Sequence, residues 1–414
     1  MFKSRASASS NPSKKEGSRR APKGKLDRPV MMGAPDKHSK KSSFGAKKPG
    51  KSRAGKPVAV FDVGSKTSKV VVGKVKDNRI YIDVLDGIIN PKSCIDDGKI
   101  VDHHGVYSTI KELLNNNGVK LRDAVFTVDS REILRREMDI ADVAKAEDRM
   151  GLVSYEMGQY LPIDTTSYVM QLKVISAYEE ERARKLKVSV GAVPKNLIEP
   201  YVKLTDDAGL ERVAMDINSN SIEKLINLEI ASNPRSSLKD KNIVFIDMGH
   251  SYFNISIFGN GRYLFNKIVE VGGVNLDNAI AERMGVSEDE AEVIKIKNGT
   301  TYSVMDIIYH LHETPDSNNL NDLVLKDSLS TLDEWANEIS QVLKYYTTRN
   351  RKNTIDEICL YGGCSFIKGI DEYFEKKLSL PTRCFYKFES VRLSNHELND
   401  NILNYLNAIG ALIR

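Results

Sequence analysis

The sequence predicts an internally duplicated α/β protein, because one structural plan occurs twice along it. In each copy an apolar strand runs into an Asp-x-Gly turn, and two further strands joined by a tight turn follow. The Asp and the Gly of the second copy lie 185 positions after those of the first. One such match would mean little, but two ordered copies indicate an internal duplication. The matching segments are 58–61, Asp62 to Thr67, 69–75 and 79–85, then 243–246, Asp247 to Ser251, 254–258 and 262–271.

The remaining chain alternates between strand-like and helix-like patterns, as expected of an α/β protein. Apolar residues at helical spacing, ended by Gly or Pro, predict helices, and short apolar or alternating runs predict strands. The segment 298–321 is rich in Asn, Asp, Ser and Thr and is expected to be loop with a short helix. The expected strands are 124–128, 133–140, 169–177, 188–193, 212–217 and 357–360, and the expected helices are 107–116, 144–160, 200–208, 275–284, 288–297, 329–349 and 366–378.

Charge divides the chain into a basic tail and an acidic body. Of the 414 residues, the first 57 carry 17 Lys and Arg against three acidic residues, although the net charge of the whole chain is only +5. The same segment holds six of the 13 prolines and two aromatic residues. Such a segment cannot bury enough apolar surface to offset the entropy of ordering it. We therefore expect residues 1–56 to be disordered and the folded body to begin at Pro57.

Two interpretations of the tail stay open. Its charge suits an electrostatic tether to an anionic membrane or an acidic partner protein, with nucleic acid the less favoured partner. Alternatively, it is a solubilising leader without a specific partner. No apolar run approaches the roughly 20 residues that span a bilayer, the basic start has no apolar stretch behind it, and the four cysteines lack CxxC spacing. These features predict a soluble, intracellular protein without a disulfide framework.

The two Asp-x-Gly turns have the residue types that hold phosphate. A turn directly after a buried strand exposes backbone N–H groups, and Gly64 and Gly249 let that backbone approach a phosphate because no Cβ stands in the way. The hydroxyls of Ser65, Thr67 and Ser251 can add donors. We expect the two turns to face each other and to grip one nucleotide tail from both sides.

The two aspartates of these turns need a different role, because a carboxylate repels phosphate. The expected role of Asp62 and Asp247 is to hold Mg²⁺, through its retained water shell, against the phosphate oxygens. A third element points to the same ligand: the apolar strand ending at Leu360 leads into Tyr361 to Ser365, with paired glycines before a helix. Glycine lets this backbone lie flat against a planar group, and a helix N-terminus favours anions.

This ordered set resembles the actin-fold ATPase superfamily over essentially all of residues 57–414. The two turns resemble its phosphate-1 and phosphate-2 loops, Tyr361 to Ser365 its adenosine loop, and Ala408 to Gly410 its second connecting motif. The segment Ala291 to Lys295 is similar to its AExxK helix, whose Glu and Lys reach the ribose and adenine. The resemblance implies ATP and Mg²⁺ as ligands. The residues expected to bind them are Asp62, Gly64, Ser65, Lys66, Thr67, Asp247, Gly249, His250, Ser251, Gly272, Gly273, Glu292, Lys295, Gly362, Gly363 and Ser365.

Within the superfamily, the region before residue 194 resembles the extra 1C domain of the FtsA/PilM branch. Glu156 to Ile163 is similar to the E-x-x-Q-Y-(I/L)-P-(F/I) helix end of the PilM family of type IV pilus assembly, and Leu186 to Ile217 is similar to it as well. The resemblance implies an actin-like (ribonuclease H-like) duplicated fold with a small inserted 1C-type subdomain. The expected parts are a tail at 1–56, domain 1A at 57–98, 194–241 and 396–414, the 1C-type subdomain at 99–193, and domain 2 at 242–395, whose 2B part covers about 275–328.

The PilM resemblance implies a cytoplasmic, ATP-binding adaptor at the inner face of the cell membrane. Its expected partner is the cytoplasmic N-terminal peptide of a PilN-like inner-membrane protein, and self-association is left open. His250 replaces a small residue and Lys66 adds charge to the first turn, and no residue stands out as orienting an attacking water. ATP binding with slow or absent hydrolysis is therefore expected. The alternative is an FtsA-like division protein that polymerises, although the sequence stops at Arg414 without the amphipathic membrane helix of that family.

Overall fold

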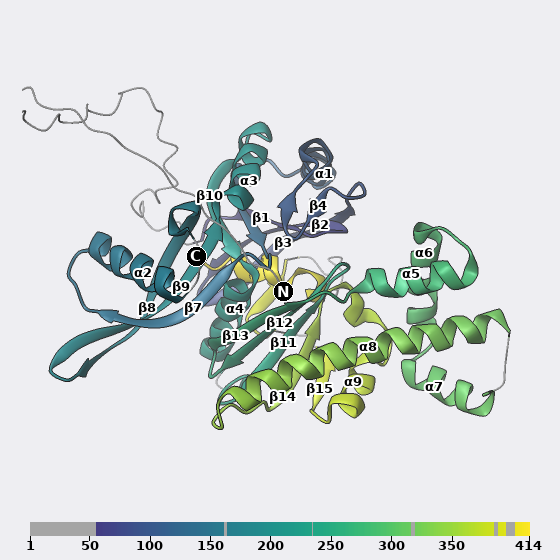
Figure 1. Ribbon diagram of the computed structural model, residues 1–414. Coiled ribbons are helices and arrows are strands. Elements are labelled where there is room, and N and C mark those ends of the chain that lie inside the picture. The colour runs from purple at the N-terminus through teal and green to yellow at the C-terminus, as the bar shows by residue number, and fades with distance from the viewer. Residues whose placement is uncertain (1–54, 161–163, 234, 316–318, 385–387, 395–401) are drawn as a thin grey trace, which may run out of the picture. The chain divides into compact units, whose positions relative to one another are not determined.

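A computed structural model describes residues 55–160, 164–233, 235–315, 319–384, 388–394 and 402–414. The expected disordered tail at 1–56 lies outside these residues except for its last two positions. Leu161 to Ile163, the end of the motif that resembles PilM, also lies outside them. The body of the protein is built on two large β-sheets, which Figure 1 shows with the helices packed against them.

The first sheet has β1 near its centre and runs in the order β10-β6-β1-β2-β3-β16. β1 pairs antiparallel with β2, and β2 pairs antiparallel with β3, while β6 lies parallel to both β1 and β10. We call this sheet and the helices packed on it the first half. Its strands are β1 (Val58–Val63), β2 (Thr67–Lys76), β3 (Arg79–Ile89), β6 (Asp123–Val128), β10 (Glu211–Ile217) and β16 (Val391–Leu393), with a short hairpin of β4 (Ile95–Asp96) and β5 (Lys99–Ile100) beside it.

The second sheet repeats the plan of the first, in the order β13-β12-β11-β14-β15 and with the same strand directions. The registers also match, since Asp62 lies opposite Lys69 across the first hairpin and Asp247 lies opposite Asn254 across the second. The predicted duplication is thereby confirmed. The strands of this second half are β11 (Asn242–Met248), β12 (Phe253–Gly259), β13 (Arg262–Val269), β14 (Glu357–Tyr361) and β15 (Thr382–Cys384).

Each sheet is buried on both faces, which explains why its central strands are continuous apolar runs. Along β1, Val58 and Val60 face a core shared with the second half, whereas Ala59 and Phe61 face a second core under two helices. The face of Ala59 and Phe61, which we call the outer face, is covered by α1 (His103–Asn116) and α3 (Lys195–Asp207). The opposite, inner face is covered by α4 (Asn218–Ser232) and α10 (Leu406–Ala411), and the 3₁₀ turn η3 (Ile402–Tyr405) precedes α10.

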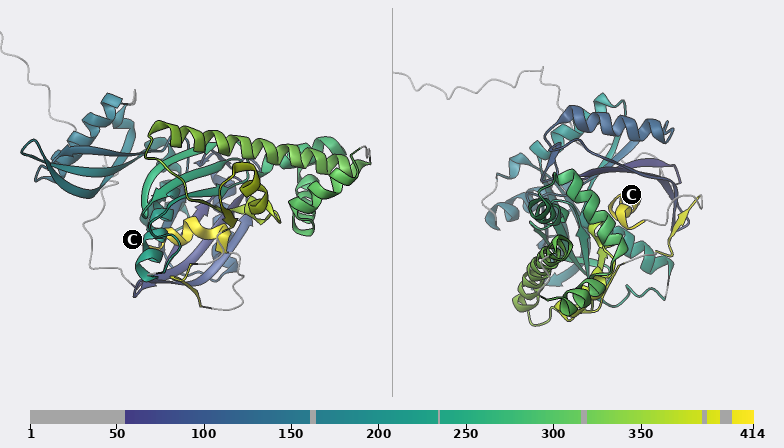
Figure 2. Two further views of the ribbon diagram at one scale, coloured as in Figure 1. Left: turned by 90° about the horizontal axis from the view of Figure 1, so that it is seen from below. Right: turned by 90° about the vertical axis from the view of Figure 1, so that its right-hand side faces the viewer.

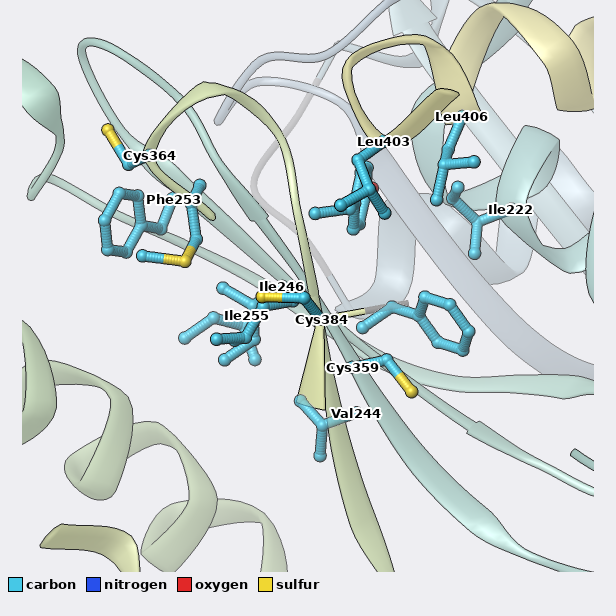
Figure 3. Close-up of a cluster of buried hydrophobic side chains, with 14 of the residues drawn as sticks. Ile222, Val244, Ile246, Phe253, Ile255, Cys359, Cys364, Cys384, Leu403 and Leu406 are labelled. Atoms are coloured by element: carbon cyan, nitrogen blue, oxygen red, sulfur yellow. The ribbon is translucent and has the colours of Figure 1, made fainter. Parts of the chain in front are cut away.

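The shared core continues across the second sheet, as Figure 3 shows for side chains from Ile222 on α4 to Val244 on β11. On the outer face of that sheet, the ring of Trp335 packs 4.9 Å from the ring of Phe253, between ring centroids. Figure 2 shows the long α8 running along this face, with other helices of the same half gathered near one of its ends. The helices of this half are α5 (Gly273–Met284), α6 (Glu288–Thr301), α7 (Val304–Glu313), α8 (Leu320–Arg349) and α9 (Ile370–Leu378), with η2 (Gly363–Phe366) after β14.

A small separate sheet with its own core lies between β6 and α3 along the chain. We call this region, residues 134–194, the small subdomain. It contains β7 (Leu134–Ala141), α2 (Ala146–Tyr160), η1 (Thr165–Ser167), β8 (Tyr168–Glu180) and β9 (Ala183–Pro194), with the sheet order β7-β9-β8. Val153 and Met157 of α2 pack on alternate residues of β9. Helix α1 covers the first sheet and β6 pairs within it, so both lie in the first half.

Several helix boundaries differ from those expected, each for a local reason. α3 begins at Lys195 and continues through Pro200, which was expected to be its first residue. α4 was not expected at all, because it follows β10 directly and its N-terminus has no side-chain cap. α8 begins nine residues before the expected Leu329, where the side chain of Asn319 accepts a hydrogen bond from the Asp322 N–H. Among the described residues, every helix is too short or too polar to cross a bilayer.

Candidate functional site

The first Asp-x-Gly turn is held in shape by hydrogen bonds to a residue from another strand end. The Gly64 N–H donates to the Thr67 carbonyl (3.1 Å), so the turn closes on itself. Asn90, directly after β3, donates its side-chain amide to the Gly64 carbonyl (2.8 Å) and its N–H to the Lys66 carbonyl (2.8 Å). Ser65 on this turn is half-buried. Asn90 therefore fixes the backbone that the sequence assigns to phosphate binding, and sequence analysis missed it.

The second turn is fixed by the start of α5, which the sequence also places in the site. The carbonyl of Gly249 accepts from the Gly273 N–H (3.1 Å), and the carbonyl of His250 accepts from the Val274 N–H (2.9 Å). Gly272 packs so closely that a Cβ there would overlap the His250 carbonyl. Ser251 is exposed at the end of the turn. The paired glycines of α5 and the second turn thus form one backbone unit.

The third loop, after β14, packs onto the same unit. Gly362 has a φ of 88°, and a Cβ there would overlap a carboxylate oxygen of Asp247. The Ser365 hydroxyl donates to the Gly362 carbonyl (2.7 Å), and the Cys364 thiol lies 3.4 Å from the Gly249 carbonyl. A Cβ on Gly363, in contrast, would have no neighbour within 4 Å. The second turn, the start of α5 and the third loop therefore meet at one place, with Gly363 facing open space.

The two aspartates lie close enough to influence each other electrostatically. Asp62 is 7% exposed, accepts a hydrogen bond from the Thr127 hydroxyl (3.1 Å) and lies 3.7 Å from the Lys69 ammonium. Asp247 accepts a hydrogen bond from the side-chain amide of Asn407 (2.7 Å). Burial raises the pKa of Asp247 to about 6; the positive charge of Lys69 opposes this rise and the negative charge of Asp62 adds to it. The carboxylates of the two halves thus share one environment.

A third carboxylate, Asp129, joins this pair and was missed by sequence analysis. It follows β6 directly, is buried, and accepts a hydrogen bond from the side-chain amide of Asn254 in the second half. Burial first, and then the charge of Asp247, raise the pKa of Asp129 well above its ordinary value. In the strand registers, Asp62 lies opposite Thr127 and Asp247 lies opposite Tyr361. Asp129, two residues after Thr127, therefore occupies the position in the first half that Gly363 occupies in the second. The apolar run 124–128 ending at Asp129 is the signal that could have found it.

Helix α6 brings the predicted Glu292 and Lys295 to the same region. The Lys66 ammonium on the first turn pairs with Glu292 (2.9 Å), and both side chains are about one-fifth exposed. This ion pair joins predicted site residues from opposite halves. Lys92, in the segment after β3, lies 3.2 Å from Asp289 at the start of α6. Lys295 is turned the other way, toward Asp277 of α5 (2.7 Å).

His250 sits among cations and is held neutral. Its imidazole is 25% exposed and lies 3.8 Å from the Asp277 carboxylate. Burial, followed by the positive charges of Lys295 and Lys66, lowers the pKa of His250 to about 4. A neutral imidazole does not repel a cation and can donate one hydrogen bond from a ring nitrogen.

Replacing His250 by glutamine is expected to reduce the fall in the free energy of unfolding between neutral and acidic pH. The folded pKa of about 4 lies below the unfolded value of 6.5, so the unfolded state binds the proton first. The stability that the neutral His250 side chain contributes is therefore fully present above pH 6.5. It is lost as the pH falls toward 4, by at most about 3 kcal/mol. Chemical denaturation of both proteins at pH 7.5 and 4.5 measures this difference. Equal pH dependence of the two unfolding free energies would contradict it.

The oxygen ligands available here fit a magnesium ion held through water. In the described part of the chain, no three His, Cys, Asp or Glu side chains are arranged to bind a metal directly. Mg²⁺ usually keeps several waters and needs only one or two carboxylates besides phosphate oxygens. The Asp62 and Asp247 side chains supply such a pair, and each already has a partner that fixes its orientation.

Two sheets that share a five-strand topology, to which the first adds β16, and that each carry an aspartate and a glycine turn at the common site, define an actin-like protein. The family model described as type IV pilus assembly protein PilM matches residues 60–414, so the chain belongs to the PilM family.

Two solved structures and one curated relative are similar to this chain. The solved structure of a PilM-PilN type IV pilus biogenesis complex has a TM-score of 0.71 at 16% identity, covering 86% of this chain and 98% of that one. The ethanolamine utilization protein EutJ from Carboxydothermus hydrogenoformans has a TM-score of 0.49 at 15% identity, covering 87% and 90%. The cell division protein FtsA of Bacillus subtilis (strain 168) is 22% identical over an alignment of 270 residues, which covers 58% of this chain and 58% of that protein. The match thus spans little more than half of FtsA.

Proposed function

We propose that this protein is an ATP-binding adaptor of type IV pilus assembly in which the nucleotide acts as a conformational clamp. The observation that carries the proposal is the convergence of three glycine loops and two carboxylates, from both halves of a PilM-family chain, at one site. A ligand gripped by both halves stabilises the state in which they are close together. Binding, rather than turnover, is then the functional event, and hydrolysis is slow or absent.

The site residues take distinct roles in this proposal. The turns at Gly64 and Gly249 hold the phosphates through backbone N–H groups, and Asp62 and Asp247 hold hydrated Mg²⁺ beside them. The charge of bound magnesium would offset the mutual repulsion of these carboxylates and of the phosphates. The third loop lies against the nucleoside, with Glu292 and Lys295 reaching its ribose and base. The other participating residues are Ser65, Lys66, Thr67, His250, Ser251, Gly272, Gly273, Gly362, Gly363 and Ser365.

The proposed partner is the cytoplasmic N-terminal peptide of a PilN-like inner-membrane protein, bound beside the small subdomain. Membership of the PilM family supports this partner, and so does the likeness to a protein solved as a PilM–PilN complex. The protein would then act in the cytoplasm, at the inner face of the membrane. The basic tail adds attraction to an anionic membrane surface or an acidic partner.

Calorimetry with Mg-ATP tests the nucleotide site. Asp247→Asn is expected to weaken binding about 10- to 100-fold, because it removes one of the two magnesium-facing charges while keeping the hydrogen bond to Asn407. The matched control is Asp96→Asn on β4, whose side chain is exposed, and its affinity should equal that of the unchanged protein. Equal affinity of the Asp247 variant would exclude this site.

A pull-down separates the pilus role from a division role, which the similarity to FtsA keeps in view. The full chain is incubated with Mg-ATP and either a synthetic N-terminal PilN-type peptide or a tubulin-like ring protein from the same organism. Retention of the peptide alone supports the proposed adaptor. Retention of the ring protein alone would overturn it in favour of the division role.

A further inference from the structure

The segment that links the first half to the small subdomain is in contact with the second half near both of its ends. It runs from Asp129, directly after β6, to Arg135 in β7. At its start, Asp129 accepts the side-chain hydrogen bond of Asn254 on β12. Two residues later, the Arg131 guanidinium pairs with Glu270, just after β13. The link to the small subdomain therefore begins in the candidate nucleotide site and touches the second half twice before β7 starts.

Arg135 joins the three parts of the body at one guanidinium group. Its side chain is only 6% exposed and belongs to an edge strand of the small subdomain. The guanidinium pairs with Glu223 on α4 of the first half and lies 4.0 Å from the ring centroid of Tyr263 on β13 of the second half. Glu223 is 7% exposed and Tyr263 is likewise 7% exposed. This is a buried ion pair capped by an aromatic ring.

Helix α4 extends this junction toward the second half. The Asn227 side-chain amide donates to the Gly261 carbonyl (2.8 Å), in the turn between β12 and β13. Figure 1 shows α4 beside β13, in agreement with this bond. From the small subdomain, the Lys173 ammonium on β8 lies 4.0 Å from the second oxygen of Glu223. Glu223 thus pairs with two cations of the small subdomain. Its helix, α4, is hydrogen-bonded to the second half.

We infer that the segment 129–135 couples closure of the two halves around nucleotide to the position of the small subdomain, with the stack of Arg135 on Tyr263 as its rigid contact. The inference rests on the proposed function and names how the partner-binding part is regulated. Separating a buried ion pair leaves an uncompensated charge, so Arg135 and Glu223 move as one body. A shift of β12 and β13 relative to the first sheet reaches this pair through Tyr263 and through the hydrogen bond of Asn227 on α4, and it thereby displaces β7.

Coupling of this kind is reciprocal, so it constrains both binding events. If nucleotide binding changes the affinity for the partner peptide by some factor, the peptide changes the affinity for nucleotide by the same factor. A typical factor is about 5- to 150-fold. The contact of Arg135 with Tyr263 lies within a few residues of Asp129 along the chain. The coupling therefore does not have to pass through the core of either large sheet.

Hydrogen exchange on the full chain, with and without Mg-ATP, tests the inference through a matched pair of variants. Mg-ATP is expected to slow amide exchange in β7 and β9 by about 5-fold or more. Tyr263→Phe keeps the ring under Arg135 and should retain this response. Tyr263→Leu removes the ring and should lose the response while Mg-ATP affinity, measured by calorimetry, changes little. A full response in Tyr263→Leu would overturn the inference, and so would Mg-ATP binding to the unchanged protein without slower exchange.

A second perturbation covers the case in which Tyr263→Leu fails to fold. Arg131→Gln removes an exposed ion pair with Glu270, in which both side chains are at least half exposed. It should reduce the exchange response at β7 without lowering the melting temperature, and Arg131→Lys, which keeps a positive charge between Glu270 and Asp97, should retain it. An unaltered response in Arg131→Gln would count against the link. Failure of the proposed function is distinguishable, because calorimetry would then detect no Mg-ATP binding to the unchanged protein.

Discussion

Replacing Gly363 by valine is expected to weaken Mg-ATP binding at least about 100-fold while leaving the melting temperature unchanged. The protein itself has room for the side chain, because a Cβ at this position has no neighbour within 4 Å and Gly363 has no left-handed φ. The space is the one that the proposed nucleoside needs, so the valine methyl groups compete with the ligand. A displacement of even 1 Å at such a contact can cost about 100-fold.

Isothermal calorimetry and thermal melting measured on the same sample check this result. The control is Gly151→Val in α2, where a Cβ also meets nothing within 4 Å but the position lies in the small subdomain. Its Mg-ATP affinity should be that of the unchanged protein. If Gly363→Val bound Mg-ATP normally, the third loop would not be part of the nucleotide site.

Replacing Gly410 by alanine is expected to lower the free energy of unfolding by about 3 kcal/mol or more. Gly410 lies in α10, where a Cβ would overlap the carbonyl of Ser221 on α4 and lie 3.1 Å from its Cα. These neighbours are backbone atoms, which cannot rotate away as a flexible side chain can. Overpacking in a close-packed core usually costs about 1–3 kcal/mol, and the rigid partner places this case at the upper end.

Chemical denaturation of the full chain measures the effect of Gly410→Ala. Gly158→Ala in α2 is the matched control, because the nearest atom to its Cβ would lie 3.9 Å away, in ordinary contact. That variant should be as stable as the unchanged protein or slightly more so, since alanine favours a helix. Equal unfolding free energies for the two variants would mean that α10 and α4 do not pack as closely as the structure has them.

The sequence could predict the duplicated hairpins because their signal is local. An apolar strand, an aspartate and a glycine follow one another directly in each copy, and the turn lengths are equal. The residues around them could not be found in this way. Asn90 and Asn407 act on the two turns from distant positions in the chain, through hydrogen bonds that only the tertiary fold creates.

Asp129 and α4 were missed for different physical reasons. Asp129 follows an apolar strand as Asp62 does, but Arg131 stands two positions later, where a glycine would have marked a phosphate turn. Helix α4 begins with Asn218 and Ser219, which usually signal a cap or a turn, and no preceding loop separates it from β10. Its apolar face, including Ile222 and Leu225, is buried between the two sheets, so tertiary packing stabilises it where local signals are weak.

The equal registers of the two hairpins have a consequence for how the duplicated halves have diverged. The residue opposite the aspartate is a lysine in the first copy, at Lys69, and a neutral amide in the second, at Asn254. The backbone symmetry of the two copies is thus preserved, but the charges differ. Asp62 lies opposite a counterion, Lys69, whereas Asp247 lies opposite the neutral side chain of Asn254. Division of labour between the copies follows, in which Lys69 offsets the charge of Asp62 in the first copy, whereas Asn254 bridges to Asp129 in the second.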